Sequence, residues 1–131
     1  MVRRIDLANL DVSDDGGGVV VARIAGDLDL SNLHHVHTAL LDTLPNEAYG
    51  LVVDLTGVTF LDSAGVETLF RLASSLAVRQ QRFAVSVPPG AMIRRALELS
   101  GAPGEMALCG SVDEALAALR AEADHGALET G

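Results

Sequence analysis

Residues 51–72, with the sequence LVVDLTGVTFLDSAGVETLFRL, join a strand pattern to a helical pattern. The run GLVVDL at 50–55 is apolar until Asp54, which is typical of a central strand that is buried on both faces. From Ser63 to about residue 80, apolar side chains recur at helical spacing, and serine is a residue type that caps helices. The stretch therefore predicts a strand, a short loop, and a helix capped by Ser63 that carries a serine hydroxyl at its start. The predicted apolar stripe of this helix consists of Val66, Leu69, Phe70, Ala73, Leu76 and Ala77.

The rest of the chain alternates strand and helix patterns around this seam. Strands are predicted at 3–12, 19–26, 82–87 and 105–109, and helices after Ser31, around 91–100 and at 111–123. Glycines at 16–18 form a turn, so the first two strands are expected to make a hairpin. The order predicts a single α/β domain with a mixed, mostly parallel central sheet of about five strands, flanked by about four helices. We expect residues 1–120 to form this domain and residues 121–131 to be a flexible C-terminal tail.

The composition excludes several classes of partner. The chain has 131 residues, 49% of them hydrophobic, and a formal net charge of -9, so phosphate backbones and anionic lipid surfaces repel it. Aromatic residues make up 3%, which leaves few rings to stack on bases. The N-terminus reaches Asp6 before any apolar run, unlike a signal peptide, and no stretch approaches ~20 apolar residues. We therefore expect a cytoplasmic protein that binds neither nucleic acid nor membrane.

Missing residue types exclude the common catalytic and nucleotide sites. The chain contains no lysine, so it cannot form a phosphate-binding P-loop. It also lacks the lysine that a two-component receiver domain needs late in its sequence, although Asp54 would suit such a domain. Ser63 as a hydrolase nucleophile would need glycine where Leu61 stands. Cys109 is the only cysteine, so no intrachain disulfide can form, and it reads as a small buried apolar residue. No cofactor is expected.

Two polar clusters have both a structural and a functional interpretation. His34, His35 and His37 lie together, and the first and last share a helix face as two metal ligands would. No Cys, Glu or Asp stands at ligand spacing, so we interpret them as a solvated helix face without metal. Asp27 and Asp29 lie in a predicted loop between a strand and a helix, where they either form a turn or face a partner.

The motifs together resemble a known family. The strand that ends in Asp54-Leu55, followed by Asp62-Ser63-Ala64-Gly65-Val66 at the start of a helix, resembles the signature of STAS domains, and in particular of bacterial anti-sigma factor antagonists. The upstream GDLDL at 26–30 and the downstream MIRRALELSGA at 92–102 resemble two further elements of that family. The resemblance covers roughly residues 17–120 in order and spacing.

The resemblance implies a protein-binding switch rather than an enzyme. In that family the serine after the aspartate, here Ser63, is phosphorylated by an anti-sigma factor that is also a GHKL-type kinase. The unphosphorylated antagonist binds this kinase and frees a sigma factor, phosphorylation ends the binding, and a PP2C-type phosphatase resets the switch. The partner surface implied by the resemblance consists of Asp27, Asp29, Ser31, Asp62, Ala64, Gly65 and Glu67.

The same family also contains STAS modules that are never phosphorylated. They dock proteins in scaffolds and transporters, and this alternative stays open at the level of sequence. Ala64 replaces a second serine that is common in the family, which leaves Ser63 as the single candidate in the motif. The oligomeric state, monomer or homodimer, also stays open.

Overall fold

The computed structural model describes residues 2–5, 8–15, 17–28 and 33–130. The strands are β1 (Val2–Ile5), β2 (Ala8–Asp14), β3 (Val19–Leu28), β4 (Gly50–Leu61), β5 (Arg82–Ser86) and β6 (Ala107–Cys109). The helices are α1 (Leu33–Thr43), α2 (Ser63–Val78), α3 (Met92–Leu99) and α4 (Val112–Thr130), with a 3-10 turn, η1, at Ala102–Gly104. Strands and helices alternate after an antiparallel start, which confirms the predicted α/β class.

The strands form a single sheet in the order β1-β2-β3-β4-β5-β6. The pairs β1–β2 and β2–β3 are antiparallel, and the pairs from β3 to β6 are parallel, so the sheet is mixed as predicted. The strand predicted at 3–12 is in fact two strands, with Ile5 of β1 opposite Ala8 of β2. The break in apolar alternation within this segment therefore marks a change of strand.

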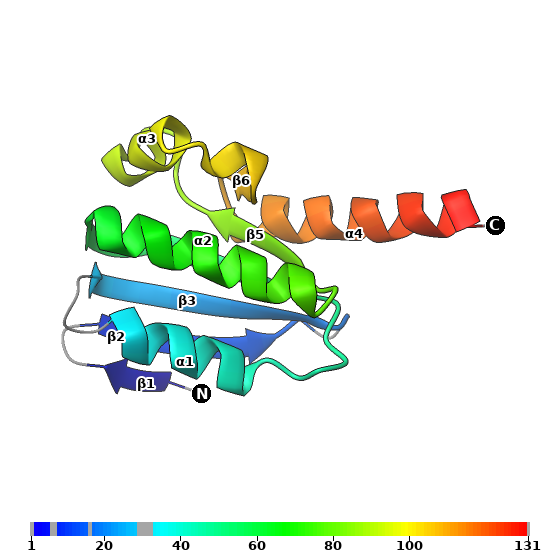
Figure 1. Ribbon diagram of the computed structural model, residues 1–131, viewed down its shortest axis with the longest axis horizontal. Helices are drawn as coiled ribbons and strands as arrows, with labels where there is room; N and C mark the ends of the chain where they lie inside the picture. The colour runs from blue at the N-terminus through cyan, green and yellow to red at the C-terminus, as the bar shows by residue number, and fades with distance from the viewer. Residues whose placement is uncertain (1, 6–7, 16, 29–32, 131) are drawn as a thin grey trace.

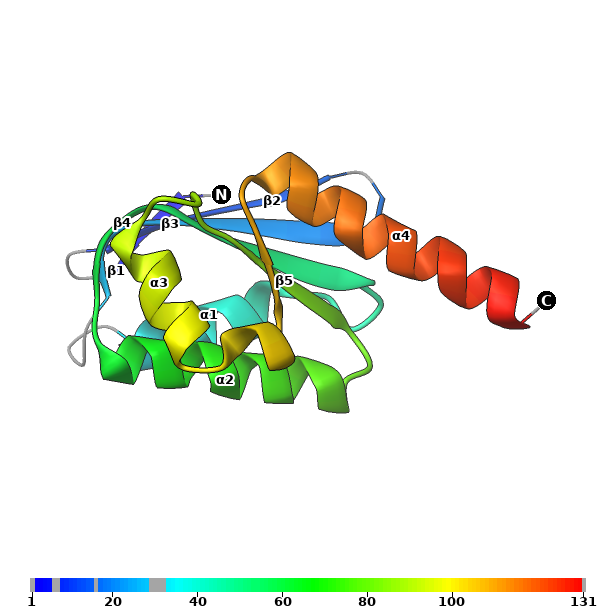
Figure 2. The same ribbon diagram turned by 90° about the horizontal axis from the view of Figure 1, so that it is seen from above.

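Helices cover both faces of the sheet. In Figures 1 and 2, α1, α2 and α3 lie on one side, and α4 lies on the other side against β5 and β6. Two apolar clusters fill these layers, the larger beneath α1, α2 and α3 and the smaller beneath α4. None of the helices in the described part of the chain is both long and apolar enough to cross a bilayer.

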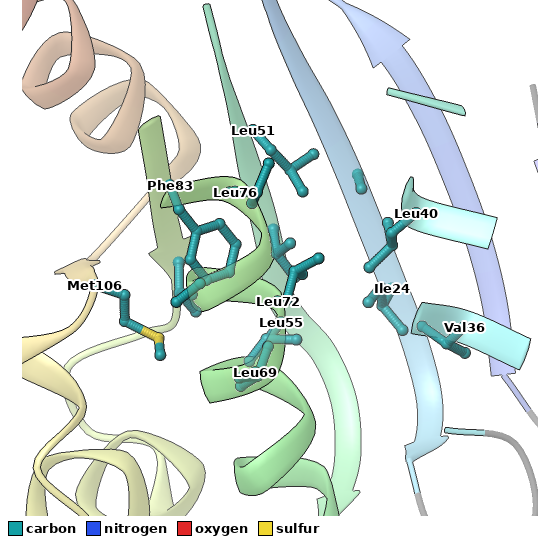
Figure 3. Packing of buried hydrophobic residues seen from close by; sticks show 14 of the residues in the cluster. Ile24, Val36, Leu40, Leu51, Leu55, Leu69, Leu72, Leu76, Phe83 and Met106 are labelled. Carbon is teal, nitrogen blue, oxygen red and sulfur yellow. The ribbon is translucent and has the colours of Figure 1, made fainter. Parts of the chain in front are cut away.

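The main core lies between α2 and the middle strands. Figure 3 shows Leu69, Leu72 and Leu76 of α2 in one layer with Leu51 and Leu55 of β4. The predicted stripe is largely correct, but it missed Leu72, which is 1% exposed, and it included Ala77, which is exposed. A helix has 3.6 residues per turn, whereas apolar residues recur every three or four positions. The buried stripe therefore shifts gradually around the helix along its length.

Helix α4 differs from its prediction at its C-terminal end. Its start agrees, because Ser111 Oγ accepts a hydrogen bond from Glu114 N at 3.1 Å, as a capping serine does. The Glu114 carboxylate accepts from Gly110 N at 3.0 Å. The helix continues past residue 123 to Thr130, so most of the segment expected as a tail is helical. Residues after 123 include alanine, leucine and glutamate, which favour helix, and Gly126 alone costs only about 1 kcal/mol.

Candidate functional site

The seam between β4 and α2 lies at the carboxyl edge of the parallel strands. β4 extends to Leu61, beyond the predicted end at Leu55, and α2 begins at Ser63. Helices α1, α2 and α3 follow β3, β4 and β5, so all three helices begin near this edge. Ligands and partners of open α/β sheets commonly bind at such an edge.

Asp62, rather than Ser63, caps helix α2. Asp62 has extended backbone angles, and its Oδ1 accepts a hydrogen bond from Gly65 N at 2.9 Å. The prediction that Ser63 is the cap is therefore wrong. Aspartate caps about as well as serine, and the direction in which the chain leaves β4 decides which of the two has the extended conformation.

Ser63 occupies the first helical position and its side chain is exposed. Its hydroxyl has no hydrogen-bond partner among the described residues. Because Asp62 makes the cap hydrogen bond, α2 does not depend on this hydroxyl for its start. A modifying enzyme can therefore reach the Ser63 Oγ without first breaking an interaction of the fold.

The two residues after Ser63 pack closely against the strand end. A Cβ atom added at Gly65 would overlap Leu61 Cδ1, so glycine allows the first turn of α2 to lie against β4. Ala64 is half-buried against the core, and its carbonyl oxygen accepts a hydrogen bond from Thr68 Oγ1 at 2.9 Å. These two residues position the helix start rather than presenting polar groups of their own.

The remaining predicted partner residues that the structure describes, Asp27 and Glu67, are acidic. Asp27 lies within β3 rather than in a loop, opposite Phe60, and its Oδ1 accepts a hydrogen bond from Thr59 Oγ1 at 2.6 Å. Glu67 forms an ion pair with Arg71 at 2.8 Å on the exposed side of α2. Asp29 and Ser31 lie outside the described residues. Asp27 of β3 and Asp62, which directly follows the neighbouring strand β4, therefore lie at the same edge of the sheet.

Two clefts flank the first turns of α2. A groove of about 470 Å³ lies between α2 and α3, and Ser63 is part of its rim. A second cleft of about 380 Å³ separates α1 from α2 and is lined by His34, His37 and Arg71 among others. Glu67 contributes to both clefts. The sequence did not predict the groove, because the residues that α3 contributes to it become neighbours of α2 only in the tertiary structure.

The histidine cluster is only partly a solvated face. His34 and His35 are exposed, but His37 is half-buried against α2, and its buried Nε2 has no hydrogen-bond partner among the residues that the structure describes. Burial lowers the pKa of His37, and the positive charges of His34 and Arg71 lower it further. Within the described residues, no three His, Cys, Asp or Glu side chains are grouped so that they could hold a metal ion.

His37 is expected to make folding stability depend on pH in mildly acidic solution. Its folded pKa lies below the ordinary value of 6.5, so as the pH falls through about 6.5 the unfolded chain takes up a proton before the folded chain does. Stability should therefore decrease as the pH falls, until the pH passes the folded pKa. Urea melts at about pH 7.5 and about pH 5.5 should show a smaller decrease for His37→Gln than for the natural sequence. His35→Gln is the matched control, and a decrease that is equal in all three proteins would contradict the assignment to His37.

The cap at Asp62 gives a second prediction. Asp62→Ala removes the acceptor for Gly65 N and is expected to lower the free energy of unfolding by about 0.5–2 kcal/mol. Ser63→Ala serves as the control, since its hydroxyl makes no hydrogen bond among the described residues, and it should cost less. Denaturant melts measure both, and a larger loss for Ser63→Ala would mean that the cap is assigned to the wrong residue.

Two other groups considered from the sequence lie away from this site. Asp54 lies within β4 rather than at its end, and it contacts Arg23 at 3.7 Å and Thr56 Oγ1 at 2.6 Å. Cys109 is buried beneath α4, where burial first and Glu114 second raise the pKa of its thiol. The interpretation of Cys109 as a small buried residue is confirmed.

The sequence is similar to those of known proteins. The family model described as Mlab, STAS domain, matches residues 10–110. The chain is 29% identical over 106 residues to the anti-sigma-F factor antagonist RsfB of Mycobacterium tuberculosis strain H37Rv, covering 81% of this chain and 85% of RsfB.

Solved structures agree with the sequence comparison. The crystal structure of an anti-sigma factor antagonist from Mycobacterium paratuberculosis matches with a TM-score of 0.76 and 28% identity, over 86% of this chain and 94% of that one. The Bacillus cell fate determinant SpoIIAA in its phosphorylated form shares the fold, with a TM-score of 0.63 and 19% identity over 84% of this chain and 98% of SpoIIAA. The seam that positions Ser63 lies within the residues that the family model matches, and the chain belongs to the STAS domain family.

Proposed function

We propose that this protein is a switch that phosphorylation of Ser63 controls. In the unphosphorylated form it binds a GHKL-type anti-sigma factor that is also a serine kinase, and a sigma factor is released. Phosphorylation of Ser63 ends the binding, and a PP2C-type phosphatase restores it. The observation that carries this proposal is the exposed Ser63 hydroxyl at the first position of α2, beside a cap that does not use it.

The fold can accept a phosphate at this position. A phosphoserine adds about -1.5 to -2 charges, and a helix N-terminus stabilises negative charge through its free amides and its dipole. The Asp62 cap hydrogen bond does not involve the Ser63 oxygen, so phosphorylation leaves it in place. We therefore expect the folded structure to persist in the phosphorylated form.

The same phosphate changes the surface that a partner meets. Asp62 is the preceding residue and Glu67 lies one turn further along α2, so the modified site would gather three anionic groups. A partner that packs an apolar or acidic surface here would lose affinity through desolvation and repulsion. The switch then acts locally and requires no refolding.

The relatives support this proposal to different degrees. RsfB is named as an anti-sigma-F factor antagonist, and it aligns over most of this chain. Structures of SpoIIAA are known in its unphosphorylated and phosphorylated forms. At 20% and 19% identity, their similarity to this protein supports a shared fold only. Anti-sigma factor antagonists act by binding a partner, so the proposed function lies in a protein-binding surface and not in a catalytic centre.

A kinase assay tests the proposal. The GHKL anti-sigma factors of the organism that encodes the chain would be purified and incubated with this protein and radiolabelled ATP. We expect one of them to transfer phosphate to the natural sequence but not to Ser63→Ala, while Ser74→Ala, which removes an exposed serine on the same helix, stays a substrate. Lack of transfer by every one of these kinases would favour a docking module that is never phosphorylated.

A further inference from the structure

We propose that the groove between α2 and α3 binds an apolar side chain of the anti-sigma factor, with basic residues of that partner beside it. This inference rests on the proposed function, because it names the way in which the kinase recognises the unphosphorylated form. The partner surface implied by the sequence contained no residue of α3. In this proposal the kinase also contacts α3.

The groove is lined mainly by apolar groups and is open at the surface. Val66 and Phe70 of α2 lie on one side, Ala96 of α3 lies on the other, and Leu61 at the end of β4 is also part of the lining. Its volume of about 470 Å³ is large enough for a bulky side chain together with part of its backbone. Two small residues, Ala96 on α3 and Ser100 directly after it, keep the groove open.

The α3 wall of the groove is firmly held. Leu97 is fully buried in the main core, and the Arg94 guanidinium donates a hydrogen bond from Nη1 to Val87 O at 2.8 Å. Figure 2 shows α3 beside the first turns of α2, in a position that the core contact and this hydrogen bond fix. A preformed groove of this kind binds with little loss of conformational entropy.

Large exposed apolar side chains occur on the elements that form the groove. Phe60 is 49% exposed at the end of β4, and Met92 and Leu99 of α3 are also exposed. Val78, at the other end of α2, is the remaining large exposed apolar residue among those that the structure describes. Met92 and Leu99 therefore add exposed apolar surface to the helix that forms one wall of the groove.

The charges around the groove indicate the chemistry of the partner. Asp62 and Glu67 both contribute to its lining, and the whole chain carries a formal net charge of -9. An apolar anchor flanked by arginine or lysine complements such a rim, and opposite charges also speed the encounter of the two proteins. An acidic protein surface or an anionic lipid surface would be repelled, which is why we assign the groove to a basic protein surface.

The groove also explains how one phosphate could end binding. Ser63 is part of the rim, so a phosphate there would place about -1.5 to -2 charges beside the apolar anchor of the partner. The anchor could then be buried only together with a charged group, which costs free energy. The same anchor would bind well next to the small neutral hydroxyl of unmodified Ser63.

Substitutions that fill the groove test this inference. Ala96→Gln places a longer neutral side chain in the groove, and Val78→Gln introduces the same residue at an exposed position of α2 outside it. Calorimetric titration with the kinase that phosphorylates the natural protein should show at least about tenfold weaker binding for Ala96→Gln and unchanged binding for Val78→Gln. Thermal melts of both variants establish that they are folded, and Ser100→Tyr fills the other end of the groove if Ala96→Gln does not fold.

The outcomes separate the groove from the switch itself. Equal affinity of the natural protein and the folded groove variants would overturn the groove while leaving Ser63 as a phosphoacceptor. If the natural protein neither binds nor is phosphorylated by any GHKL anti-sigma factor of its organism, the proposed function fails and the groove assignment fails with it. Weaker binding of the groove variants, with unchanged binding of Val78→Gln, would support both the groove assignment and the proposed function.

Discussion

Leu69→Ala is expected to lower the free energy of unfolding by about 2–5 kcal/mol. Leu69 is 5% exposed and belongs to the main core, where Figure 3 shows it with Leu55 of β4 and Leu72 of its own helix. Truncation removes buried apolar surface and leaves a cavity that the neighbouring strands can fill only in part. A loss of this size is a large fraction of the total stability of a small domain.

Denaturant melts of the two proteins measure this loss directly. Val78→Ala is the matched control on the same helix, since Val78 is 85% exposed and its truncation should change stability by only about 0.5 kcal/mol or less. Similar losses for both variants would mean that α2 faces the sheet with a different side. The control also reports any general effect of alanine on the helix.

Ser63→Asp is expected to weaken binding of the anti-sigma factor by at least about tenfold while leaving the fold intact. The aspartate places a negative charge beside Asp62 and at the rim of the groove, as the phosphate would. In the first turn of a helix this charge interacts favourably with the dipole, so stability should stay within about 1–2 kcal/mol of the natural protein.

Binding and stability must be measured on the same samples for this variant. Ser74→Asp adds an equal charge at an exposed position of α2 and should bind the kinase as the natural protein does. If Ser63→Asp and Ser74→Asp bind with the same affinity, charge at the rim of the groove does not control the interaction. If Ser63→Asp instead unfolds, the first turn of α2 depends on Ser63 in a way that the hydrogen bonds of the structure do not explain.

The alternation of strands and helices could be predicted because it follows from local patterns. The continuous apolar run at 50–55 and the helical spacing after Ser63 correctly indicated β4 and α2. The extension of β4 through residues 56–61 could not be predicted in the same way. This segment mixes apolar and polar side chains, and its strand conformation is supported by pairing of Phe60 and Leu61 with β3, which is a tertiary interaction.

The position of the candidate site could be predicted, but its details could not. The motif around Ser63 correctly located a hydroxyl at the start of a helix. Asp62 and Ser63 are both good capping residues, so the local sequence could not decide between them, and the exit of the chain from β4 selected Asp62. The half-burial of His37 likewise depends on how α1 packs against α2, which helical spacing alone does not determine.

In the proposed switch, the phosphorylation state of Ser63 controls binding of the anti-sigma factor. The most direct measurement is a calorimetric titration of that kinase against the protein before and after its own phosphorylation reaction, with mass spectrometry to establish that Ser63 carries the phosphate. We predict measurable binding of the unphosphorylated protein and at least about tenfold weaker binding of the phosphorylated protein. Equal affinity of the two forms would contradict the proposed switch.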